Sequence, residues 1–371
     1  MNKKIILFVM NELTAGGAER VIVNLANNFD REKFDVHLCL FKKTGQLVDS
    51  LQDDITLHDL KSARVRNGAL KFFLLTLSLK PDFVFSNIYH VNLFVSIQIK
   101  ALRLLLKNTK FIARETNTPS LRAKYKKSSS KGDLIFKRTI NNFDRVIAQS
   151  RYMKDDLVNT YNINQDKISV INNPLDIKNI NLQLNKPISK KETLFIKNKK
   201  THILAIGALQ EQKGFDNLLK AVPYLDDRLH LNILGDDRKK EEKEILVKII
   251  NDLNITERVT FLGYQKNPYE FINKSDLVVL SSRYEGFPNV VIESHACGKF
   301  VVAFECPGVN SEIIKNDVNG YLVENGNIKA LADSINKYSK MNFDNKRIKQ
   351  TTDRYHVNKI IEEYEQILFN L

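Results

Sequence analysis

The alternation of short β-branched runs with longer amphipathic runs, which occurs twice along the chain, most constrains its fold. Strand-like runs lie at 5–10, 35–41, 55–60, 82–87, 110–114, 145–150 and 168–173, and again at 202–207, 229–235, 258–263, 276–282, 300–304 and 320–323. Helix-like runs lie between several of them, at 18–29, 215–222, 239–253, 268–274 and 288–297. This rhythm predicts two α/β units, each with a doubly wound parallel sheet and helices on both faces.

A polar stretch divides the two units. Residues 172–200 are rich in Lys and Asn and show little hydrophobic periodicity, which is typical of an interdomain linker. We therefore expect an N-terminal Rossmann-like domain at 1–175, a linker at 176–200 and a second Rossmann-like domain at 201–354. The tail at about 355–371 is predicted to be an amphipathic helix that packs back on the N-terminal domain.

No apolar run in the sequence has the length of a membrane span. The run Ile5–Met10 is short, and Phe72–Leu79 falls far below the ~20 residues that a bilayer requires. We expect a chain that does not cross a membrane. Its three cysteines lack CxxC spacing, which argues against a disulfide framework and a zinc site and favours a reducing cytoplasm; they are Cys39, Cys297 and Cys306.

Positive charge is concentrated in the first half of the chain. Residues 1–175 contain 28 Lys and Arg against 16 Asp and Glu, whereas 176–371 contain 29 against 27. Between Lys100 and Lys131 there are ten basic residues and one acidic residue, Glu115. This surplus favours an anionic partner surface, either lipid or nucleic acid, and the alternative is a solvated basic face without a partner.

Two carboxylates, Glu285 and Glu293, flank a Gly/Pro turn that directly follows the strand-like run at 276–282. Ligands of open parallel sheets bind outside the carboxyl ends of the strands, so Glu285 lies where a ligand is expected. Pro288 suits the first turn of a helix, and the backbone N–H groups after it favour an anion. Two acceptors for hydroxyls with anion-binding donors between them match a sugar nucleotide, which has hydroxyls at both ends and a diphosphate between them.

Glycines at the ends of two other strand-like runs point to the same kind of ligand. Gly207 ends a run, and Lys213-Gly214 stands just before a helix; lysine is a compact cation suited to a diphosphate. Gly16-Gly17 lies between the first strand and the first helix, and adjacent glycines let a backbone approach a phosphate or sugar. Each is common alone as a turn or surface residue, but their joint position at strand ends favours a ligand site.

Together these motifs resemble those of the retaining nucleotide-sugar glycosyltransferases of the GT-B class, family 4 (glycosyl transferases group 1). The resemblance covers nearly the whole chain. The E-x7-E signature appears as Glu285–Glu293, the Gly-x-Leu…Lys-Gly element at 207–214, and the Gly-Gly pair at 16–17. The segments at 172–176 and 307–314 match further elements. The resemblance implies a GT-B fold, in which two Rossmann-like doubly wound domains face each other across a cleft.

The resemblance also implies a role for each motif residue. Glu293 would accept from the ribose hydroxyls, Lys213 would neutralise the leaving diphosphate, and Glu285 would contact the transferred sugar. The amides of Gly286, Phe287 and Asn289 would join Glu285, and the Val290 N–H would face the diphosphate. The full donor-binding set is expected to be Gly17, Gly207, Lys213, Glu285, Gly286, Phe287, Pro288, Asn289, Val290 and Glu293.

The sequence departs from the family pattern at two positions. Ala208 stands where the family usually has Arg, so Lys213 would carry more of the leaving-group charge or another cation would help. A His that many members have after the run at 110–114 is replaced by the segment 114–117, RETN, where Glu115 is the expected substitute or else a surface partner of nearby lysines. The expected catalytic residues are thus Glu285, Lys213 and Glu115, and the expected acceptor or cleft residues are Gly16, His90, Arg114 and Asn117.

The implied reaction transfers a hexosyl or N-acetylhexosaminyl group from a nucleotide-sugar, by family habit a UDP-sugar, with retention of anomeric configuration. Same-face attack, with the leaving phosphate taking the acceptor proton, requires no side-chain nucleophile. No D-x-D triplet occurs in the chain, which fits a metal-independent enzyme without a cofactor.

The acceptor is expected on the basic N-terminal domain. The runs at 69–80 and 99–114 combine apolar residues with Lys and Arg, a pattern suited to a membrane surface, although most of these apolar residues must be core. A lipid-linked saccharide at the inner face of the cytoplasmic membrane would explain both features. The product would be a surface polysaccharide such as an O-antigen, a capsule or an exopolysaccharide.

Three other functions remain open at this point. A GT-B-like epimerase would act on the nucleotide-sugar without an acceptor, but the E-x7-E element belongs to transferases. A basic nucleic-acid-binding protein would explain the charge, but the chain has no such motif and no Trp. An NAD enzyme is disfavoured because no G-x-G-x-x-G follows the first strand of either half.

Overall fold

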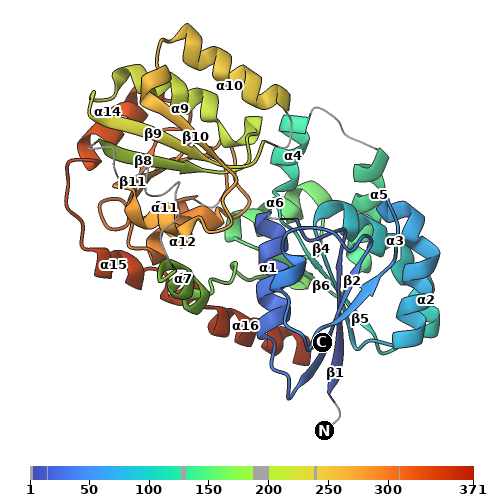
Figure 1. Cartoon of the computed structure of the whole chain (residues 1–371). Coiled ribbons are helices and arrows are strands. Elements are labelled where there is room, and N and C mark those ends of the chain that lie inside the picture. The colour runs from blue at the N-terminus through green and yellow to red at the C-terminus, as the bar shows by residue number, and fades with distance from the viewer. Residues whose placement is uncertain (1–2, 15, 127–130, 187–199, 238–239, 309) are drawn as a thin grey trace. The chain divides into compact units, whose positions relative to one another are not determined.

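The computed structural model describes residues 3–14, 16–126, 131–186, 200–237, 240–308 and 310–371. It forms two compact units, each described here by itself. Unit 1 comprises Met1–Pro174 and Tyr355–Leu371, and unit 2 comprises Leu175–Arg354. Both are α/β units (Figure 1).

Unit 1 contains a parallel sheet of seven strands in the order β3-β2-β1-β4-β5-β6-β7. Its central strands are buried on both faces, which explains why the sequence shows continuous apolar runs there rather than alternation. The strands are β1 (Lys4–Met10), β2 (Phe34–Leu40), β3 (Thr56–Asp59), β4 (Phe83–Asn87), β5 (Lys110–Arg114), β6 (Arg145–Ala148) and β7 (Ile168–Val170).

Helices cover both faces of this sheet. Right-handed crossovers require that connections running toward β3 and those running toward β7 lie on opposite faces. One face is covered by α1 (Gly17–Asn28) and α16 (Val357–Phe369), which pack on strand residues such as Ile6 and Phe8. The other face carries α2 (Ala69–Leu79), α3 (Tyr89–Leu105), α4 (Pro119–Lys126), α5 (Lys131–Thr139) and α6 (Arg151–Tyr161), as Figure 1 shows for α1, α2 and α3.

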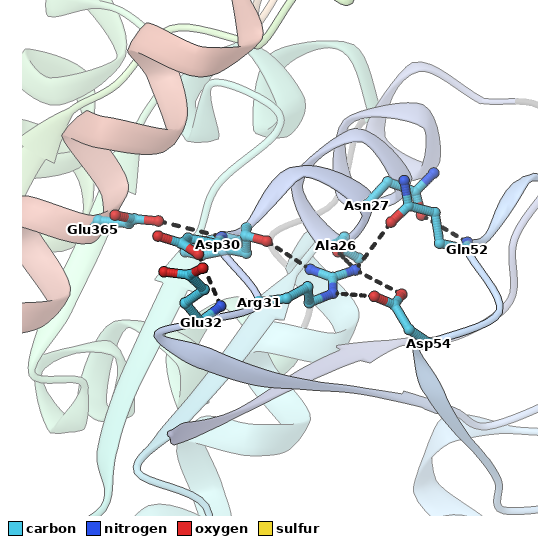
Figure 2. Close-up of polar contacts among 9 residues, drawn as sticks. Ala26, Asn27, Asp30, Arg31, Glu32, Gln52, Asp54 and Glu365 are labelled. Atoms are coloured by element: carbon cyan, nitrogen blue, oxygen red, sulfur yellow. Dashed lines mark hydrogen bonds and ion pairs between the residues drawn. The ribbon is translucent and has the colours of Figure 1, made fainter. Parts of the chain in front are cut away.

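The C-terminal helix α16 is fixed to unit 1 by polar contacts as well as by its apolar face. Glu365 of α16 accepts from the backbone N–H of Asp30 and forms an ion pair with Lys33 at 2.7 Å. Beside it, Arg31 donates to the Asp54 carboxylate at 2.8 and 3.1 Å and to the Ala26 carbonyl (Figure 2). These contacts join the end of α1, the segment before β2 and the last helix to one another.

Unit 2 contains a parallel sheet of six strands in the order β10-β9-β8-β11-β12-β13. The strands are β8 (Thr201–Ile206), β9 (Leu229–Leu234), β10 (Val259–Gly263), β11 (Leu277–Leu280), β12 (Val301–Phe304) and β13 (Gly320–Val323). The helices are α7 (Ile177–Leu184), α9 (Phe215–Ala221), α10 (Lys240–Asp252), α11 (Tyr269–Lys274), α12 (Asn289–Ala296), α13 (Asn310–Ile313), α14 (Ile328–Tyr338) and α15 (Asn345–Gln350).

The predicted strands agree with the structure, and the predicted linker differs from it in part. Each strand-like run overlaps an observed strand, with differences only at the ends. Within the expected linker at 176–200, however, residues 177–184 form α7, which belongs to unit 2. Asp176 caps this helix by accepting from the Asn179 N–H at 2.9 Å, and Ile180 is buried. Residues 187–199 lie outside the described part of the chain.

Two further expectations concern single segments. Among the described residues, no helix combines the length and apolar character that crossing a bilayer requires. The three cysteines, Cys39, Cys297 and Cys306, are buried free thiols, in agreement with the prediction that the chain has no disulfide framework.

Candidate functional site

The strand order identifies one topological switch point in each sheet. In unit 2 the chain runs outward from β8 through β9 to β10 and then returns to β11 on the other side of β8. In unit 1 the corresponding point lies between β1 and β4. Loops at the carboxyl ends of such neighbouring strands diverge and leave room for a ligand. The predicted donor residues from Gly207 to Glu293 follow β8 and β11, the two strands at the switch point of unit 2.

Lys213 is positioned by the glycines around it. Its aliphatic stem lies across Gly207, where a Cβ atom would come within 3.0–3.2 Å of three of its carbons. Gly214 has φ +61° and lies against the Ser281 carbonyl, so a side chain there would be strained and would clash. The Ser281 hydroxyl donates to the Lys213 carbonyl at 3.0 Å. These contacts hold the loop after β8 against the loop after β11.

Glu285 and Lys213 form an ion pair at this junction. Lys213 Nζ lies 2.8 Å from Glu285 Oε1, and the same oxygen accepts from the Ser282 hydroxyl at 2.6 Å. The Glu285 side chain is 5% exposed and that of Lys213 is 22% exposed. The Glu285 N–H donates to the Pro307 carbonyl at 3.2 Å, and Gly308, with φ +135°, packs directly on the Glu285 backbone. Lys213 is therefore the member of the pair that a ligand can reach.

A second ion pair braces the same two loops. Arg283 donates to both carboxylate oxygens of Asp216 at 2.8 and 2.7 Å, and also to the Glu211 carbonyl at 2.6 Å. Burial would raise the pKa of Asp216, but the hydrogen bonds and charge of Arg283 outweigh it and lower that pKa. The Gln212 side chain donates to the Tyr284 carbonyl at 3.1 Å. This brace keeps Lys213 opposite Glu285.

The turn between Glu285 and α12 is enclosed. Gly286, Phe287 and Pro288 are buried, whereas Asn289, Val290 and Glu293 are partly exposed. Pro288 is the N-cap residue rather than part of the first turn, so the helix begins at Asn289, one residue later than predicted. The Asn289 N–H donates to the Phe287 carbonyl at 3.0 Å, so that amide is already engaged. Val290 lies in the first turn, where an N–H has no intrahelical acceptor.

His295 lies on α12 two residues beyond Glu293 and has a structural role. It is buried, and desolvation lowers the pKa of its imidazole to about 3. His37, His202 and His230, which also lie within predicted strands, are buried as well. These buried side chains pack in the interior of their units.

The Gly16-Gly17 turn begins α1 at the switch point of unit 1. Gly16 is the N-cap, and a Cβ atom there would come within 3.0 Å of the Glu19 carboxylate, three positions along. Glu19 Oε1 accepts from the Thr14 hydroxyl at 3.2 Å, so the third helical residue folds back toward the loop before the helix. The Asn87 side chain at the end of β4 donates to the Ala18 carbonyl at 3.2 Å. Gly17 is exposed.

Arg114, which was predicted to be an acceptor or cleft residue, lies among side-chain amides in unit 1. Its side chain is completely buried at the end of β5. The guanidinium donates to Asn87 Oδ1 at 3.0 Å and makes a short hydrogen bond to Asn173 Oδ1. It therefore joins the ends of β4 and β5 to the segment after β7, and we assign it to the interior of unit 1.

Glu115 is also fully buried, which excludes the surface ion pair with lysines that the sequence left open. Its Oε1 accepts from Asn92 Nδ2 at 2.6 Å, and its backbone carbonyl accepts from the Gln149 side chain at 2.7 Å. Oε2 has no hydrogen-bond partner within the described part of the chain. Burial raises the pKa of this carboxyl to about 7, against the lowering effects of Asn92 and of the Arg122 and Arg114 charges. The structure thus encloses this carboxyl group in unit 1, and its catalytic role stays a prediction.

The other two predicted residues of unit 1 are accessible. His90 is exposed in the first turn of α3, just after Ile88, which has an unusual φ of +73° for a β-branched residue. Asn117 is partly exposed in the loop between β5 and α4. Both follow strands at the carboxyl edge of the sheet, where ligands of parallel sheets bind.

Several residues of the site escaped the sequence analysis. Ser282, Arg283 and Asp216 hold the Lys213–Glu285 pair, and Asn87 and Asn92 hold Arg114 and Glu115. Ser282 and Arg283 directly precede the motif and were visible as its neighbours. Nothing in the spacing of Asp216 distinguishes it from an ordinary acidic residue in the first turn of a helix.

Each unit has a parallel sheet with one topological switch point, and unit 2 has an ion pair at that point. This arrangement is the GT-B fold of nucleotide-sugar glycosyltransferases. HepE of Anabaena, solved with UDP and glucose, matches with a TM-score of 0.82 at 20% identity, covering 99% of this chain and 100% of that one. WaaG, a glycosyltransferase involved in lipopolysaccharide biosynthesis, matches with a TM-score of 0.75 at 13% identity over 98% and 99%.

Sequence comparison then identifies the family. The profile "Glycosyltransferase Family 4" matches residues 15–179, and "Glycosyl transferases group 1" matches residues 188–354. A Campylobacter jejuni N-acetylgalactosamine-N,N'-diacetylbacillosaminyl-diphospho-undecaprenol 4-alpha-N-acetylgalactosaminyltransferase is 30% identical over 87% of this chain and 86% of its own. The Escherichia coli lipopolysaccharide 1,6-galactosyltransferase is 24% identical over 61% and 62%. The chain therefore belongs to the group 1, family 4 glycosyltransferases. Among the functions that the sequence left open, this family membership supports the glycosyltransferase.

Proposed function

We propose that this chain transfers a hexosyl or N-acetylhexosaminyl group, with retention, from a UDP-sugar to a lipid-linked saccharide during surface polysaccharide synthesis. The observation that carries the proposal is the Lys213–Glu285 pair at the switch point of unit 2, directly before α12 with Glu293. A cation, a fixed carboxylate and a helix N-terminus at one sheet edge suit a diphosphate between two hydroxyl-bearing groups.

We propose that Lys213 exchanges its partner when the donor binds, leaving Glu285 for the diphosphate. In the structure the ammonium group is neutralised by Glu285, whose carboxylate also accepts from Ser282. A diphosphate offers Lys213 a stronger counter-charge, while the Ser282 hydroxyl keeps Glu285 in place for a sugar hydroxyl. Glu293, partly exposed on α12, is proposed to accept from the ribose, and the Val290 N–H to face the diphosphate.

The reaction breaks the bond between the anomeric carbon and the diphosphate oxygen and forms one between that carbon and an acceptor hydroxyl oxygen. Negative charge grows on the leaving phosphate, where Lys213 and the first-turn N–H groups of α12 stabilise it. The acceptor proton passes to a leaving phosphate oxygen on the same face of the sugar. No protein nucleophile takes part, so Glu285 orients the sugar rather than attacking it.

We propose that neither a metal ion nor a cofactor is needed, because Lys213 and the α12 amides supply the positive charge that the diphosphate requires. Activity is expected to survive dialysis against EDTA. With Ala208 in place of the family's Arg, this proposal makes Lys213 the principal side-chain cation of the donor site.

The acceptor proposal is supported by the named substrates of the relatives. The Campylobacter enzyme, as its name states, acts on an undecaprenol diphosphate-linked saccharide, and the HepE crystals contain UDP. We propose the same chemical classes for this chain, with the enzyme peripheral on the inner face of the cytoplasmic membrane. His90, Asn117 and Gly16 are the proposed acceptor residues, and Glu115 is proposed to position the loop that carries Asn117.

The experiment that tests this proposal is a thermal-shift screen against UDP-, GDP- and ADP-sugars, because a ligand that binds the folded state raises its apparent stability. We expect a shift with UDP-sugars that Glu293→Ala abolishes. Glu244→Ala, the same change at an exposed position of α10 outside the matched elements, serves as the control. A shift that is equal in all three proteins, or larger with another nucleotide, would contradict the donor assignment.

A further inference from the structure

Two segments of unit 1 carry the accessible residues that are proposed for the acceptor. The first, residues 88–92, follows β4 and contains His90, and we call it the β4–α3 segment. The second, residues 115–122, follows β5 and contains Asn117, and we call it the β5–α4 segment. Strands β4 and β5 pair along their length, so the two segments leave the sheet from neighbouring positions. Whatever fixes one segment against the other also fixes the distance between His90 and Asn117.

Helix α4, where the β5–α4 segment ends, is short and largely polar, so it offers little apolar surface to hold it in place. Pro119, Leu121 and Arg122 are buried, whereas Ala123 and Lys124 are exposed. An arginine is rarely buried unless its guanidinium is paired. The contacts of Arg122 therefore show how α4 is held.

The guanidinium of Arg122 contacts three other helices. Its carbon Cζ lies 3.3 Å from the centroid of the Tyr89 ring, which belongs to the first turn of α3. One of its nitrogens makes short hydrogen bonds to the Asp133 carboxylate of α5 and to the Tyr161 hydroxyl of α6. A planar guanidinium can stack on an aromatic ring while its edge donates hydrogen bonds, which an ammonium group cannot do. One side chain thus joins α4 to α3, α5 and α6.

The ring on which Arg122 stacks is itself held by the core of unit 1. Tyr89 packs edge to face against Phe136, with ring centroids 5.0 Å apart, and Phe136 packs in the same way against Tyr161 at 5.3 Å. Phe136 is fully buried. Because Tyr89 directly precedes His90, Arg122 fixes α4 against the backbone that carries one of the proposed acceptor residues.

A second contact joins the same two segments. Asn92 Nδ2 donates to Glu115 Oε1 at 2.6 Å, and the Asn92 side chain is fully buried. This contact holds the first residue of the β5–α4 segment, and the stack of Arg122 on Tyr89 holds the last one. Asn117 lies between these two fixed points. A short segment fixed at both ends has few conformations left, so Asn117 is held in place relative to the first turn of α3.

We infer that Arg122 is a positioning residue for the acceptor, because its guanidinium holds the segment that carries Asn117 against the segment that carries His90. Arg122 is 8% exposed, so it acts through these two residues and not by touching the acceptor itself. The inference rests on the proposed function, in which His90 and Asn117 bind the acceptor. It concerns unit 1 alone, and donor binding in unit 2 should not depend on Arg122.

Steady-state kinetics test the inference, with undecaprenyl diphosphate-linked N-acetylgalactosamine as the acceptor probe. Arg122→Met keeps an unbranched side chain but removes the stacking and the hydrogen bonds, and should raise the KM for the acceptor about 30-fold or more. The KM for the UDP-sugar should stay unchanged. Arg122→Lys can still pair with Asp133 but cannot stack and donate to Tyr161 at once, and should raise the acceptor KM about tenfold.

Hydrogen exchange of the backbone amides provides a measurement that needs neither donor nor acceptor. In Arg122→Met the amides of the β5–α4 segment should exchange about tenfold faster or more, while those of β5 and β6 keep their rates. Such a local change is expected of a residue that anchors one segment. Faster exchange throughout unit 1 would instead make Arg122 a general stabiliser of the fold and would overturn the inference.

The matched control is Arg145→Met, which makes the same change at the amino edge of the same sheet. Arg145 is partly buried at the start of β6 and donates to the Asp166 carbonyl at 2.7 Å. This variant should leave both the acceptor KM and the exchange of the β5–α4 segment unchanged. If it raised the acceptor KM as much as Arg122→Met does, the effect would not be specific to the two segments, and the inference would be wrong.

Failure of the inference and failure of the proposed function differ in the protein that shows them. If the unchanged protein transfers no sugar to the acceptor probe, the proposed function fails. If the unchanged protein is active and Arg122→Met has the same acceptor KM, the inference fails while the proposed function stands. An equal rise in the KM values for donor and acceptor would also overturn the inference, because Arg122 would then not act through the acceptor residues.

Discussion

The carboxyl edges of the two sheets hold charged side chains in contrasting ways. In unit 2, Lys213 and Glu285 form an ion pair in which the lysine is 22% exposed. In unit 1, Arg114 and Glu115 are completely buried and are held by side-chain amides, Asn87 and Asn173 on one and Asn92 on the other. The same topology thus brings charges to both edges, but only in unit 2 is one of them open to exchange its partner.

The contrast follows from what surrounds each charge. Gly207 gives the Lys213 stem room to lie across the backbone, and the loops around Lys213 are tied by contacts that do not use its ammonium group. Around Arg114 the side-chain oxygens of Asn87 and Asn173 accept from the guanidinium itself, and complete burial keeps a ligand away from it. A charge with one partner can serve binding, whereas a charge enclosed by several serves the fold.

The largest effect is expected at the exchangeable charge. Lys213→Gln keeps most of the stem over Gly207 but removes the cation, and should lower the rate of sugar transfer about 1000-fold, about 4 kcal/mol of transition-state stabilisation. Steady-state kinetics with the UDP-sugar measure this, with Lys274→Gln, an exposed lysine of α11, as the control. If Lys213→Gln transferred sugar at a rate within a few-fold of the unchanged enzyme, Lys213 would not be the binding charge that distinguishes the carboxyl edge of unit 2 from that of unit 1.

The second prediction concerns the enclosed charge of unit 1. Arg114→Met leaves the Asn87 and Asn173 oxygens without their donor, and should reduce the stability of unit 1 by about 3 to 4 kcal/mol. Hydrogen exchange of the β5 amides reports this loss. Arg103→Met is the control, because its ion pair with Asp144 is partly exposed and should contribute about 1 kcal/mol or less. Similar losses of stability in the two variants would show that the buried hydrogen bonds of Arg114 contribute no more than a partly exposed ion pair.

The third prediction uses the pKa of Glu115. Burial raises it to about 7 from the ordinary 4.5, so the folded state retains a proton that the unfolded state has released between these two values. The stability of unit 1 therefore falls as pH rises from about 4.5 to 7 and levels off above, by about 3 kcal/mol in all. Glu115→Gln should be flat over this window and more stable than the unchanged protein at pH 8.

Exchange of the β5 amides at pH 5 and pH 8 measures this difference. The Gln oxygen can still accept from Asn92, so the variant tests the proton alone. A steep pH dependence that persists in Glu115→Gln would assign the effect to another group, and a variant that is less stable at pH 8 would contradict the raised pKa.

The smallest effect is expected from the hydroxyl that holds Glu285. Ser282→Ala removes one of its two side-chain donors while Lys213 remains, and should cost about 1 kcal/mol, seen as an increase of several-fold in the KM for the donor. Ser281→Ala, which loses a hydrogen bond to the Lys213 backbone, is the matched comparison. If both serines affect kcat rather than KM, they act on the chemical step and not on donor binding.

Much of this arrangement could be predicted from the sequence. The strands are short apolar runs bounded by polar residues or glycine, and their alternation with helices fixed the fold class and the position of Gly207, Lys213 and Glu285 at strand ends. The roles of Arg114 and Glu115 could not be predicted, because a basic or acidic residue at a strand end looks the same whether it faces solvent or an enclosed set of amides. Those amides come from positions 27 and 59 residues away from Arg114 and 23 from Glu115.

Helix α7 shows a second limit. Its sequence, INLQL within a polar stretch, has too few apolar residues for a clear period, yet Ile180 is buried and the Gln183 carbonyl accepts from Asn267. Tertiary contacts with α11 therefore stabilise a helix that local pattern alone did not indicate.

Helix α16 carries a consequence for the order in which the chain is made. Unit 1 is built from the first 174 residues and the last 17, and the late part supplies Val357, Ile360, Ile361, Tyr364 and Leu368 to the core under β1. A ribosome finishes all of unit 2 before this piece emerges, so unit 1 begins first and closes last. Until α16 has been synthesised, the apolar surface that it covers in unit 1 stays exposed in the nascent chain.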